Sequence, residues 1–329
     1  MMQATAESGD VGPLLVLVSA VCFGAMAIFG KLAYGAAVPA DVLLALRFTV
    51  AAGLMGAILA VRPNLRARPR GPAHADCGKA ANRRAVFTAL GLGAVGYAAQ
   101  SALFFSALTR IDASLAALVL YTYPVLVTIA AAALGRERLT RRRGMAVLTA
   151  SAGTVLVLLG AGGMRFDIAG VGLAFGSAVT YTLYILVSDT VVNRLPPVML
   201  SALVMAGASV TLGCRALLTS GMSLHFSPAG WIWVACIAVI STVVAMLTFF
   251  AGLARTGPST ASILSTLEPV VTTMLAALTL HDFLTSVQLA GGALVLSSVA
   301  VIQLRTGSAA ARPVRAHPAE SESPASAAS

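Results

Sequence analysis

Ten apolar segments, each at least 18 residues long and nearly free of charge, occupy most of this 329-residue chain. A helix needs about 20 apolar residues to cross a hydrocarbon core of about 30 Å, and it satisfies its own backbone hydrogen bonds in lipid. The segments are too long for barrel strands and show no polar/apolar alternation. We therefore predict an all-α integral membrane protein with ten transmembrane helices. The segments cover residues 11–34, 40–61, 85–108, 113–134, 144–161, 168–188, 198–218, 229–253, 259–280 and 285–304.

The distribution of charge indicates a membrane protein rather than a nucleic-acid-binding protein. Hydrophobic residues make up 58% of the chain and charged residues only 10%, against about a quarter charged in ordinary globular proteins. The net charge is +10. If the N-terminus is cytoplasmic, most lysines and arginines fall in cytoplasmic segments, as the positive-inside rule requires. We predict a multi-pass protein of the cytoplasmic (inner) membrane with both termini cytoplasmic, and no nucleic-acid partner.

The ninth segment, STASILSTLEPVVTTMLAALTL, places a carboxylate and a proline together at Glu268 and Pro269. Both positions fall near the middle of the span, where an ionisable side chain is costly and marks a candidate functional site. Pro269 lacks a backbone N–H and crowds the carbonyl of Ser265, so the helix should kink there. Either Glu268 lines a substrate cavity, or it is a structural glutamate that caps the backbone freed at the kink.

An internal repeat gives the fourth segment a similar proline. A shift of 145 residues aligns Phe104 with Phe249 and Pro124 with Pro269. Earlier in the chain the shift is 158, as for Pro39 and Pro197, because the loop after the second segment is longer than its counterpart. Pro-interrupted segments at corresponding positions of two halves point to a transporter's binding site.

The repeat divides the chain into two units of five spans each, residues 11–161 and 168–304. An odd number of spans turns the second unit upside down relative to the first, which predicts an inverted-topology repeat with the substrate site between the halves. Residues 62–84 form a cytoplasmic basic loop that we expect against the anionic leaflet. Residues 306–329 are expected to be a disordered tail.

Further candidate cavity residues are polar or aromatic side chains inside other spans. Such side chains are expected to point into the helix bundle, where they either contact substrate or only form interhelical hydrogen bonds. Tyr97, Gln100 and Ser101 share one helix face by their i, i+3, i+4 spacing. Tyr123 stands where the second half has Glu268. The complete set of candidates is Glu268, Pro269, Ser265, Tyr121, Tyr123, Pro124, Tyr97, Gln100, Ser101, Tyr181 and Tyr184.

Four charged residues near the ends of spans have simpler interpretations. For Lys31 we favour extension to the lipid headgroups over a role in the cavity. Arg47 lies deeper, so either inward pairing or the same extension would suit it. Glu137, among arginines, is expected to form a solvated ion pair of little energetic weight. Asp189 is expected at the interface.

These features resemble the EamA-type transporters of the drug/metabolite transporter superfamily. The resemblance rests on the paired segments YPVLVTIAAAALGRERLT and EPVVTTMLAALTLHDFLT and on the glycine-containing helix after each. It implies a central cavity lined by both halves and small metabolites, amino acids or amphiphilic drugs as substrates. The acid usual in the family after this segment is Glu137 in the first half but Asp282, preceded by His281, in the second.

The expected function is secondary transport of a small organic solute by alternating access, in the direction of export. Removal from water disfavours a charged carboxylate, so Glu268 could exchange a proton with solvent or neutralise a cationic substrate. A passive channel and a non-transporting membrane protein are the alternatives. The oligomeric state is left open.

An enzyme is not expected from this sequence. No GxSxG, HExxH or phosphate-binding loop is present. The cysteines lack metal-ligand spacing. We accordingly expect no metal and no cofactor.

Overall fold

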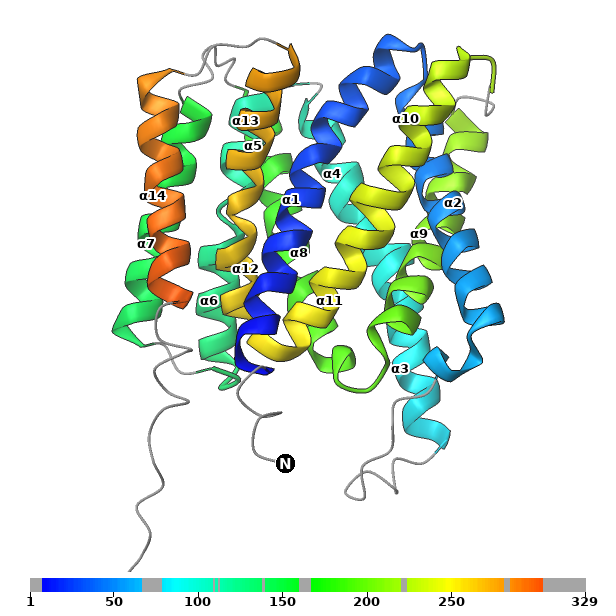
Figure 1. Ribbon diagram of the computed structural model, residues 1–329, viewed down its shortest axis with the longest axis horizontal. Helices are drawn as coiled ribbons and strands as arrows, with labels where there is room; N and C mark the ends of the chain where they lie inside the picture. Colours follow the sequence, from blue (N-terminus) through cyan, green and yellow to red (C-terminus); the bar gives the residue numbers. More distant parts are fainter. Residues whose placement is uncertain are drawn as a thin grey trace, which may run out of the picture.

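The computed structural model is a single bundle, whose helices run between two opposite faces (Figure 1). We refer to the region between these faces as the layer. The structure describes residues 8–66, 79–108, 110–111, 113–137, 140–159, 167–219, 224–280 and 285–303, and every regular element among them is helical. The predicted tail at 306–329, His281 and Asp282 lie outside the described residues, as does most of the predicted loop at 62–84. Lys79 already begins a helix, so the loop is shorter than predicted.

The helices follow one another in the order that the apolar segments predict. Two segments are interrupted by short breaks, and two others contain a stretch of π-helix. The elements are α1 (Ser8–Gly35), α2 (Ala40–Val61), η1 (Pro63–Arg66), α3 (Lys79–Gly91), η3 (Leu92–Tyr97), α4 (Ala98–Leu108), α5 (Ala113–Leu120), α6 (Tyr123–Ala133), α7 (Arg141–Leu159), α8 (Ile168–Val192), α9 (Pro197–Thr219), α10 (Pro228–Ala238), η4 (Val239–Val244), α11 (Ala245–Thr256), α12 (Pro258–Ser265), α13 (Leu267–Leu280) and α14 (Ser286–Gln303).

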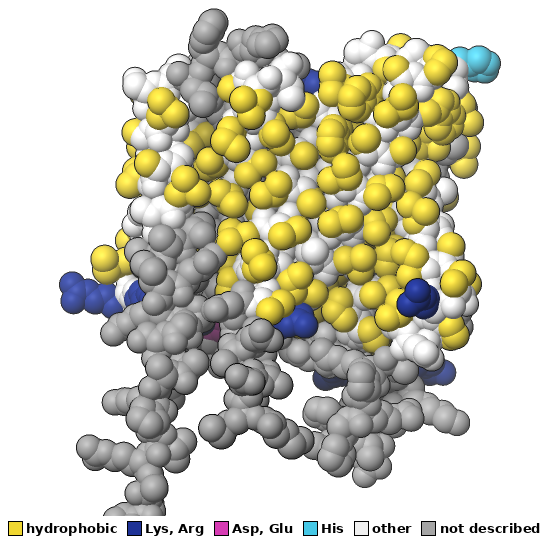
Figure 2. Space-filling model, viewed as in Figure 1, with side chains coloured by type: hydrophobic (Ala, Val, Ile, Leu, Met, Phe, Trp, Pro, Cys, Tyr) yellow, Lys and Arg dark blue, Asp and Glu magenta, His cyan; other side chains and the backbone are white. Residues whose placement is uncertain are grey.

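Seven helices of the described chain are long and apolar enough to cross a membrane. Two further apolar helices, Tyr123–Ala133 and Ser286–Ser298, are shorter. Hydrophobic side chains cover the middle of the visible face, and several basic side chains lie near its lower edge (Figure 2). An apolar band of this extent is suited to lipid. The seven long helices are Val11–Gly35, Ala40–Val61, Arg83–Phe104, Ile168–Val192, Pro197–Thr219, Pro228–Thr256 and Pro258–Thr279.

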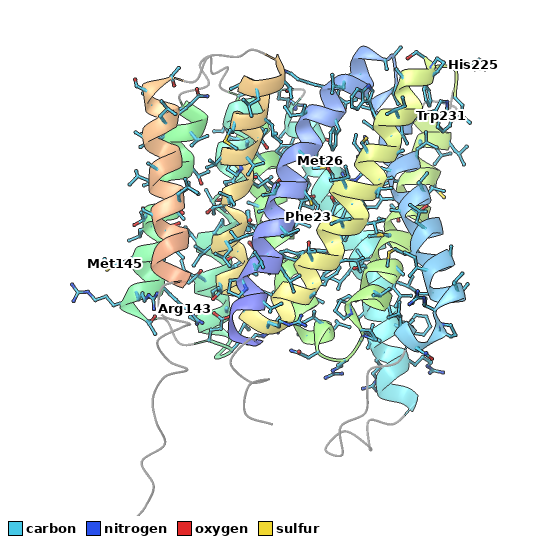
Figure 3. All side chains as sticks on the ribbon, in the orientation of Figure 1. Phe23, Met26, Arg143, Met145, His225 and Trp231 are labelled. Atoms are coloured by element: carbon cyan, nitrogen blue, oxygen red, sulfur yellow. The ribbon has the colours of Figure 1, made fainter. Side chains whose placement is uncertain are left out.

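Both ends of the described chain lie on one face of the layer (Figure 1). We call this face, where α1 begins and α14 ends, the terminal face. The opposite face, where α1 ends and α2 begins, is the far face. Arg143 lies at the terminal face, and Trp231 lies near the start of α10 at the far face (Figure 3).

Glycines allow several helix backbones to approach closely. A Cβ on Gly93 of η3 would overlap the carbonyl oxygen of Val204 in α9. In the pair formed by α7 and α14, a Cβ on Gly153 would lie 2.7 Å from the carbonyl oxygen of Gly291. Small residues at helix crossings permit this packing in membranes. Because these glycines have no side chain, the backbones of η3 and α9, and those of α7 and α14, pack directly against each other.

The two proline-containing spans are interrupted rather than merely bent. The fourth span breaks at Tyr121 and Thr122, between α5 and α6, and the ninth breaks at Thr266, between α12 and α13. At both breaks a threonine hydroxyl donates to the carbonyl three residues back, Thr122 to Val119 at 2.7 Å and Thr266 to Ile263 at 2.6 Å. The same two carbonyls also accept the backbone N–H of Thr122 at 3.2 Å and of Thr266 at 3.1 Å, so each threonine closes its own break with two hydrogen bonds.

Candidate functional site

A central cavity of about 420 Å³ lies between the helices of the two halves. Its volume falls within the range usual for small-molecule sites, about 300–1,000 Å³. Phe23 and Met26 face it from the middle of α1 (Figure 3). The cavity is lined by Phe23, Met26, Gly30, Lys31, Tyr34, Leu43, Leu44, Arg47, Tyr97, Gln100, Ser101, Phe104, Ala117, Leu120, Tyr121, Tyr123, Tyr181, Ile237, Glu268, Pro269 and Thr272.

Most of the candidate residues predicted from the sequence meet at this cavity. Tyr97, Gln100, Ser101, Tyr121, Tyr123, Tyr181, Glu268 and Pro269 all line it. Ser265, Pro124 and Tyr184 do not line it and are buried in the surrounding protein. The shared face predicted for Tyr97, Gln100 and Ser101 is present, because all three border the same space. Gln100 also donates from Nε2 to Ser177 Oγ of α8 at 3.2 Å, so this side chain serves interhelical bonding as well.

A continuous row of aromatic rings runs along one side of the cavity, and four of its six members, Tyr97, Tyr181, Tyr123 and Tyr121, line it. Its members come from α2, η3, α8, α6 and the break before α6, so the row ties four helical spans together. Edge-to-face and stacked rings at these separations add to the energy of burial. We call this row the aromatic wall. In order it comprises Phe48, Tyr97, Tyr184, Tyr181, Tyr123 and Tyr121, with successive centroid separations of 5.0, 6.0, 6.0, 4.7 and 5.9 Å.

Glu268 lies in the first turn of α13, immediately after the break in the ninth span. The helix α1 approaches here because Gly24 has no side chain: a Cβ would lie 2.9 Å from the Glu268 carbonyl oxygen. One turn further on, Thr272 Oγ1 donates to the Gly24 carbonyl at 2.9 Å. The Glu268 carboxylate lies within hydrogen-bonding reach of the Tyr121 hydroxyl. The break and the glycine contact together hold the acid at the cavity surface.

Arg47 is a cavity residue that the sequence left undecided. Its side chain is 4% exposed and points inward from α2. Nε donates to Thr242 Oγ1 at 2.6 Å, and Nη2 donates to the Tyr97 hydroxyl at 3.2 Å and to the Ser241 carbonyl at 3.4 Å. The Thr242 hydroxyl in turn donates its hydrogen to the Ile237 carbonyl at 2.8 Å. The Thr242 oxygen therefore acts as the acceptor for Arg47. Two π-helical stretches, η3 and η4, thus meet at one guanidinium group.

Lys31 was expected at the lipid headgroups, but it also lines the cavity while remaining exposed. Its position near the end of α1 is compatible with both contacts. The position of Lys31 in the sequence could not show that it lines a cavity, because the cavity forms only when other helices pack beside α1.

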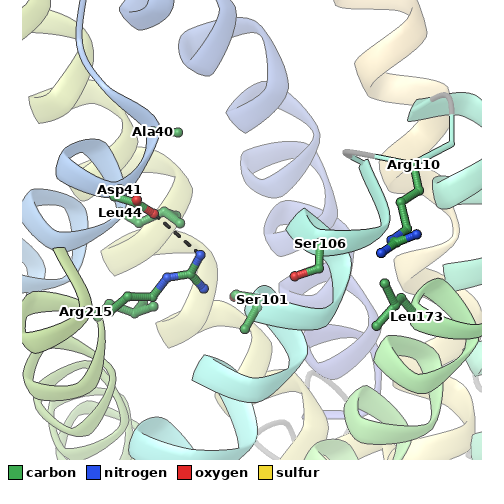
Figure 4. A pocket seen from close by; sticks show the side chains of 10 residues that line it. Ala40, Asp41, Leu44, Ser101, Ser106, Arg110, Leu173 and Arg215 are labelled. Carbon is green, nitrogen blue, oxygen red and sulfur yellow. Dashed lines mark ion pairs between the residues drawn. The ribbon is translucent and has the colours of Figure 1, made fainter. Parts of the chain in front are cut away.

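A second cavity of about 580 Å³ adjoins the central one toward the far face, and Leu44 and Ser101 line both. We call it the vestibule. Arg110 and Arg215 face it (Figure 4). Arg215 pairs with Asp41 at 3.8 Å. Arg110 pairs at 3.5 Å with Asp167, outside the vestibule lining.

The terminal face is closed below the cavity. Glu137, after α6, is only 11% exposed, pairs with Arg143 at 2.9 Å, and accepts a long 3.5 Å contact from the Ser259 backbone N–H at the start of α12. The predicted ion pair with an arginine is present, but the expectation that it is solvated was wrong, because α12 covers this carboxylate. Asp189 pairs with Arg136 at 3.7 Å and is partly exposed, and Arg136 also donates to the Leu186 carbonyl at 2.6 Å.

Nothing in the described residues has the composition of a metal centre. No group of three or more His, Cys, Asp or Glu side chains that could hold an ion is found within that part of the chain.

Comparison with known proteins gives one family over most of the chain. Residues 10–159 and 168–304 each match the EamA-like transporter family. The chain is 26% identical over 316 residues to the uncharacterized transporter YcbK of Bacillus subtilis (strain 168), covering 93% of this chain and 97% of the relative. It is also 26% identical to the uncharacterized transporter YwfM of the same organism, over 64% of this chain and 71% of the relative. A crystal structure with 23% identity has a TM-score of 0.73 and covers 90% of this chain and 97% of its own, a likeness of fold.

Proposed function

Because the chain belongs to the EamA-like transporter family, we propose that it is a secondary transporter that carries a small organic solute by alternating access. The observation that carries the proposal is the central cavity, which reaches toward the far face while Glu137 and its neighbours close the terminal face. A cavity open to one side only is what alternating access requires of each end state. In this proposal the terminal face is cytoplasmic, the membrane is the inner membrane, and the direction is export.

The architecture proposed for this mechanism is ten spans arranged as two inverted five-helix repeats. The α5/α6 and α12/α13 pairs would be the fourth and ninth spans. Three packing relations support the arrangement: α7 lies along α14, α2 lies along α9, and the contact of α1 with α11 has its counterpart in that of α8 with α4. When the two halves are exchanged, the pairs α7–α14 and α2–α9 each map onto themselves, and the pair α1–α11 maps onto α8–α4. Rocking one half against the other would then open the terminal face and close the far face.

We assign the solute contacts to the cavity side chains, with Glu268 as the central one. The members of the aromatic wall that line the cavity would pack against the apolar part of the solute. Glu268 would take up a proton or contact a cationic group, since a carboxylate away from water exchanges its charge readily with such partners. Ser265, Pro124 and Tyr184 lie behind the lining and would shape the cavity rather than contact the solute.

Counterflow in proteoliposomes tests the transport proposal. Purified protein would be reconstituted and screened with labelled amino acids, quaternary cations and nucleobases, with and without a pH gradient. A carrier shows faster uptake of labelled solute when the vesicles contain unlabelled solute, whereas a pore does not. Equal uptake into loaded and empty vesicles for every transported solute would replace the carrier by a passive channel. Faster efflux than uptake under one gradient supports export.

The variant Glu268→Gln tests proton coupling. It keeps the size and hydrogen bonding of the side chain but cannot lose a proton. We expect the wild type to depend on a pH gradient between about pH 5.5 and 8 and the variant to lose that dependence. Asp167→Asn, which changes an acid outside the cavity, is the matched control. A variant that still responds to the pH gradient as the wild type does would remove Glu268 from the coupling.

A further inference from the structure

The charge of Arg47 is buried in the span without an acid in hydrogen-bond or ion-pair contact, and Glu268 is the one acid that lines the same cavity. The hydrogen-bond acceptors of Arg47 are the hydroxyls of Thr242 and Tyr97 and the carbonyl of Ser241, all of them neutral. Across the described chain, no ion pair joins Arg47 to a carboxylate. A buried charge is costly unless it is paired, and intramembrane charges usually serve a site. The neutral partners orient the guanidinium but leave its charge available.

The orientation leaves donors directed at the cavity. Nε and Nη2 hold Thr242, Tyr97 and Ser241, so the hydrogens on Nη1 are not used by any described residue. Arg47 lines the cavity. A guanidinium whose plane is already fixed offers a carboxylate charge-assisted hydrogen bonds from Nη1 with little further loss of freedom.

Other charges along the path also favour an anionic group. The central cavity is lined by two basic residues, Lys31 and Arg47, and by one acid, Glu268. The vestibule is lined by two arginines and by one acid, Asp41. The two vestibule arginines pair with Asp41 and Asp167, so the excess of positive side chains lies in the central cavity, and an excess of one sign of charge in a cleft concentrates solutes of the other sign.

Resting on the transport function proposed above, we propose that the transported solute carries a carboxylate and that Arg47 is the residue that binds it. The rest of the solute packs against the aromatic wall and the apolar side chains of Phe23 and Met26, which line the same space. Arg47 is then the specificity-determining residue of the cavity, and its tie to η3 and η4 couples the presence of the carboxylate to the two π-helical stretches.

The test compares carboxylates with their primary amides on purified wild-type protein. The probes are acetate, 3-phenylpropanoate and L-phenylalanine, each beside its amide, with 2-phenylethylamine as the cation-only probe. Binding is measured as a ligand-dependent rise in melting temperature and as the dissociation constant from titration. We expect at least one carboxylate to bind about tenfold or more tightly than its amide. L-phenylalanine against 3-phenylpropanoate then reports whether an added ammonium group helps. If no carboxylate binds, or if the amides bind equally well, the proposal is wrong.

Variants assign the effect to Arg47. Arg47→Gln should lower carboxylate affinity about tenfold or more, with little change for amides, whereas Arg194→Gln, which removes an exposed arginine beyond α8, should bind as the wild type does. Arg47→Lys keeps the charge without the fixed guanidinium plane and should bind carboxylates with intermediate affinity. An unchanged carboxylate affinity in Arg47→Gln overturns the proposal. The wild-type comparison remains decisive if that variant does not fold.

Counterflow separates this inference from the transport function. A carboxylate that binds but shows no trans-stimulation leaves the Arg47 site in place and contradicts the carrier. Trans-stimulation confined to solutes without a carboxylate leaves the carrier in place and overturns the assignment of Arg47.

Discussion

The contacts of Glu137 at the closed terminal face predict how strongly a substitution there destabilises the closed state, and the structure gives the magnitude. Exposed ion pairs contribute about 0–1 kcal/mol, whereas breaking a fully buried pair costs about 3–5 kcal/mol. The side chains of Glu137 and Arg143 are 11% and 31% exposed, and the contact to the Ser259 N–H is long, at 3.5 Å. We therefore expect Glu137→Gln to weaken the closed terminal face by about 1–2 kcal/mol. Such a change raises the population of states open at that face by a factor of about 5–30.

Cysteine accessibility measures this population. Ser262 of α12 is fully buried one turn above the closure, so a Ser262→Cys reporter should react slowly with a membrane-impermeant maleimide applied from the terminal face. The reporter is placed in a background without the native cysteines Cys22, Cys77, Cys214 and Cys236. Glu137→Gln should increase the labelling rate about 5–30-fold.

The matched control is Asp167→Asn at the other face. It removes the exposed 3.5 Å pair with Arg110 and keeps an acceptor for the Gly170 N–H at the start of α8. Labelling should then stay at the wild-type rate. A Glu137→Gln protein labelled no faster than its parent would refute the reasoning, because the carboxylate would then contribute nothing to closure.

Three further substitutions test the packing around the cavity. Gly93→Ala would drive a Cβ into the Val204 carbonyl and should cost about 1–3 kcal/mol, seen as a lower melting temperature in detergent. Gly257→Ala would put a side chain at φ +78° beside Glu137 and should cost about 1–2 kcal/mol, also in melting temperature. Tyr181→Phe keeps the ring contacts at 4.7 and 6.0 Å and should transport in counterflow as the wild type does, whereas Tyr181→Ala should lose most of that activity. Stability of the alanine variants equal to that of the wild type, or transport by Tyr181→Ala, would contradict these expectations.

The parts of the fold that follow from local chemistry could be predicted from the sequence. The segment lengths indicate spanning helices, and the prolines at 124 and 269 mark the two breaks to within three residues. Polar and aromatic residues are easy to recognise within apolar spans, and they are expected to point into the bundle. Most of the predicted candidates accordingly line one cavity. Sequence spacing could not separate the lining from the layer behind it, where Ser265 and Tyr184 lie.

What the sequence missed depends on contacts between distant parts of the chain. Arg47 could have reached the headgroups, and its inward direction is decided by Thr242, 195 positions away. Glu137 is covered by α12, whose first residues lie more than 100 positions later. The π-helical stretches η3 and η4 have no signature in the apolar pattern, since one extra residue in a turn changes neither hydrophobicity nor length appreciably.

Departures from the proposed repeat explain why its two halves would contribute unequally to recognition. The 145-residue shift places Tyr123 opposite Glu268, and both line the cavity, but only the second half supplies a charge. The 158-residue shift places Met205 opposite Arg47, and Met205 is fully buried in the apolar core while Arg47 borders the cavity. A scaffold of two similar halves can rock between equivalent end states whatever its side chains are. In the proposed mechanism the solute, by contrast, would meet one guanidinium from the first half and one carboxylate from the second, so residues that the repeat does not duplicate would set its orientation in the cavity.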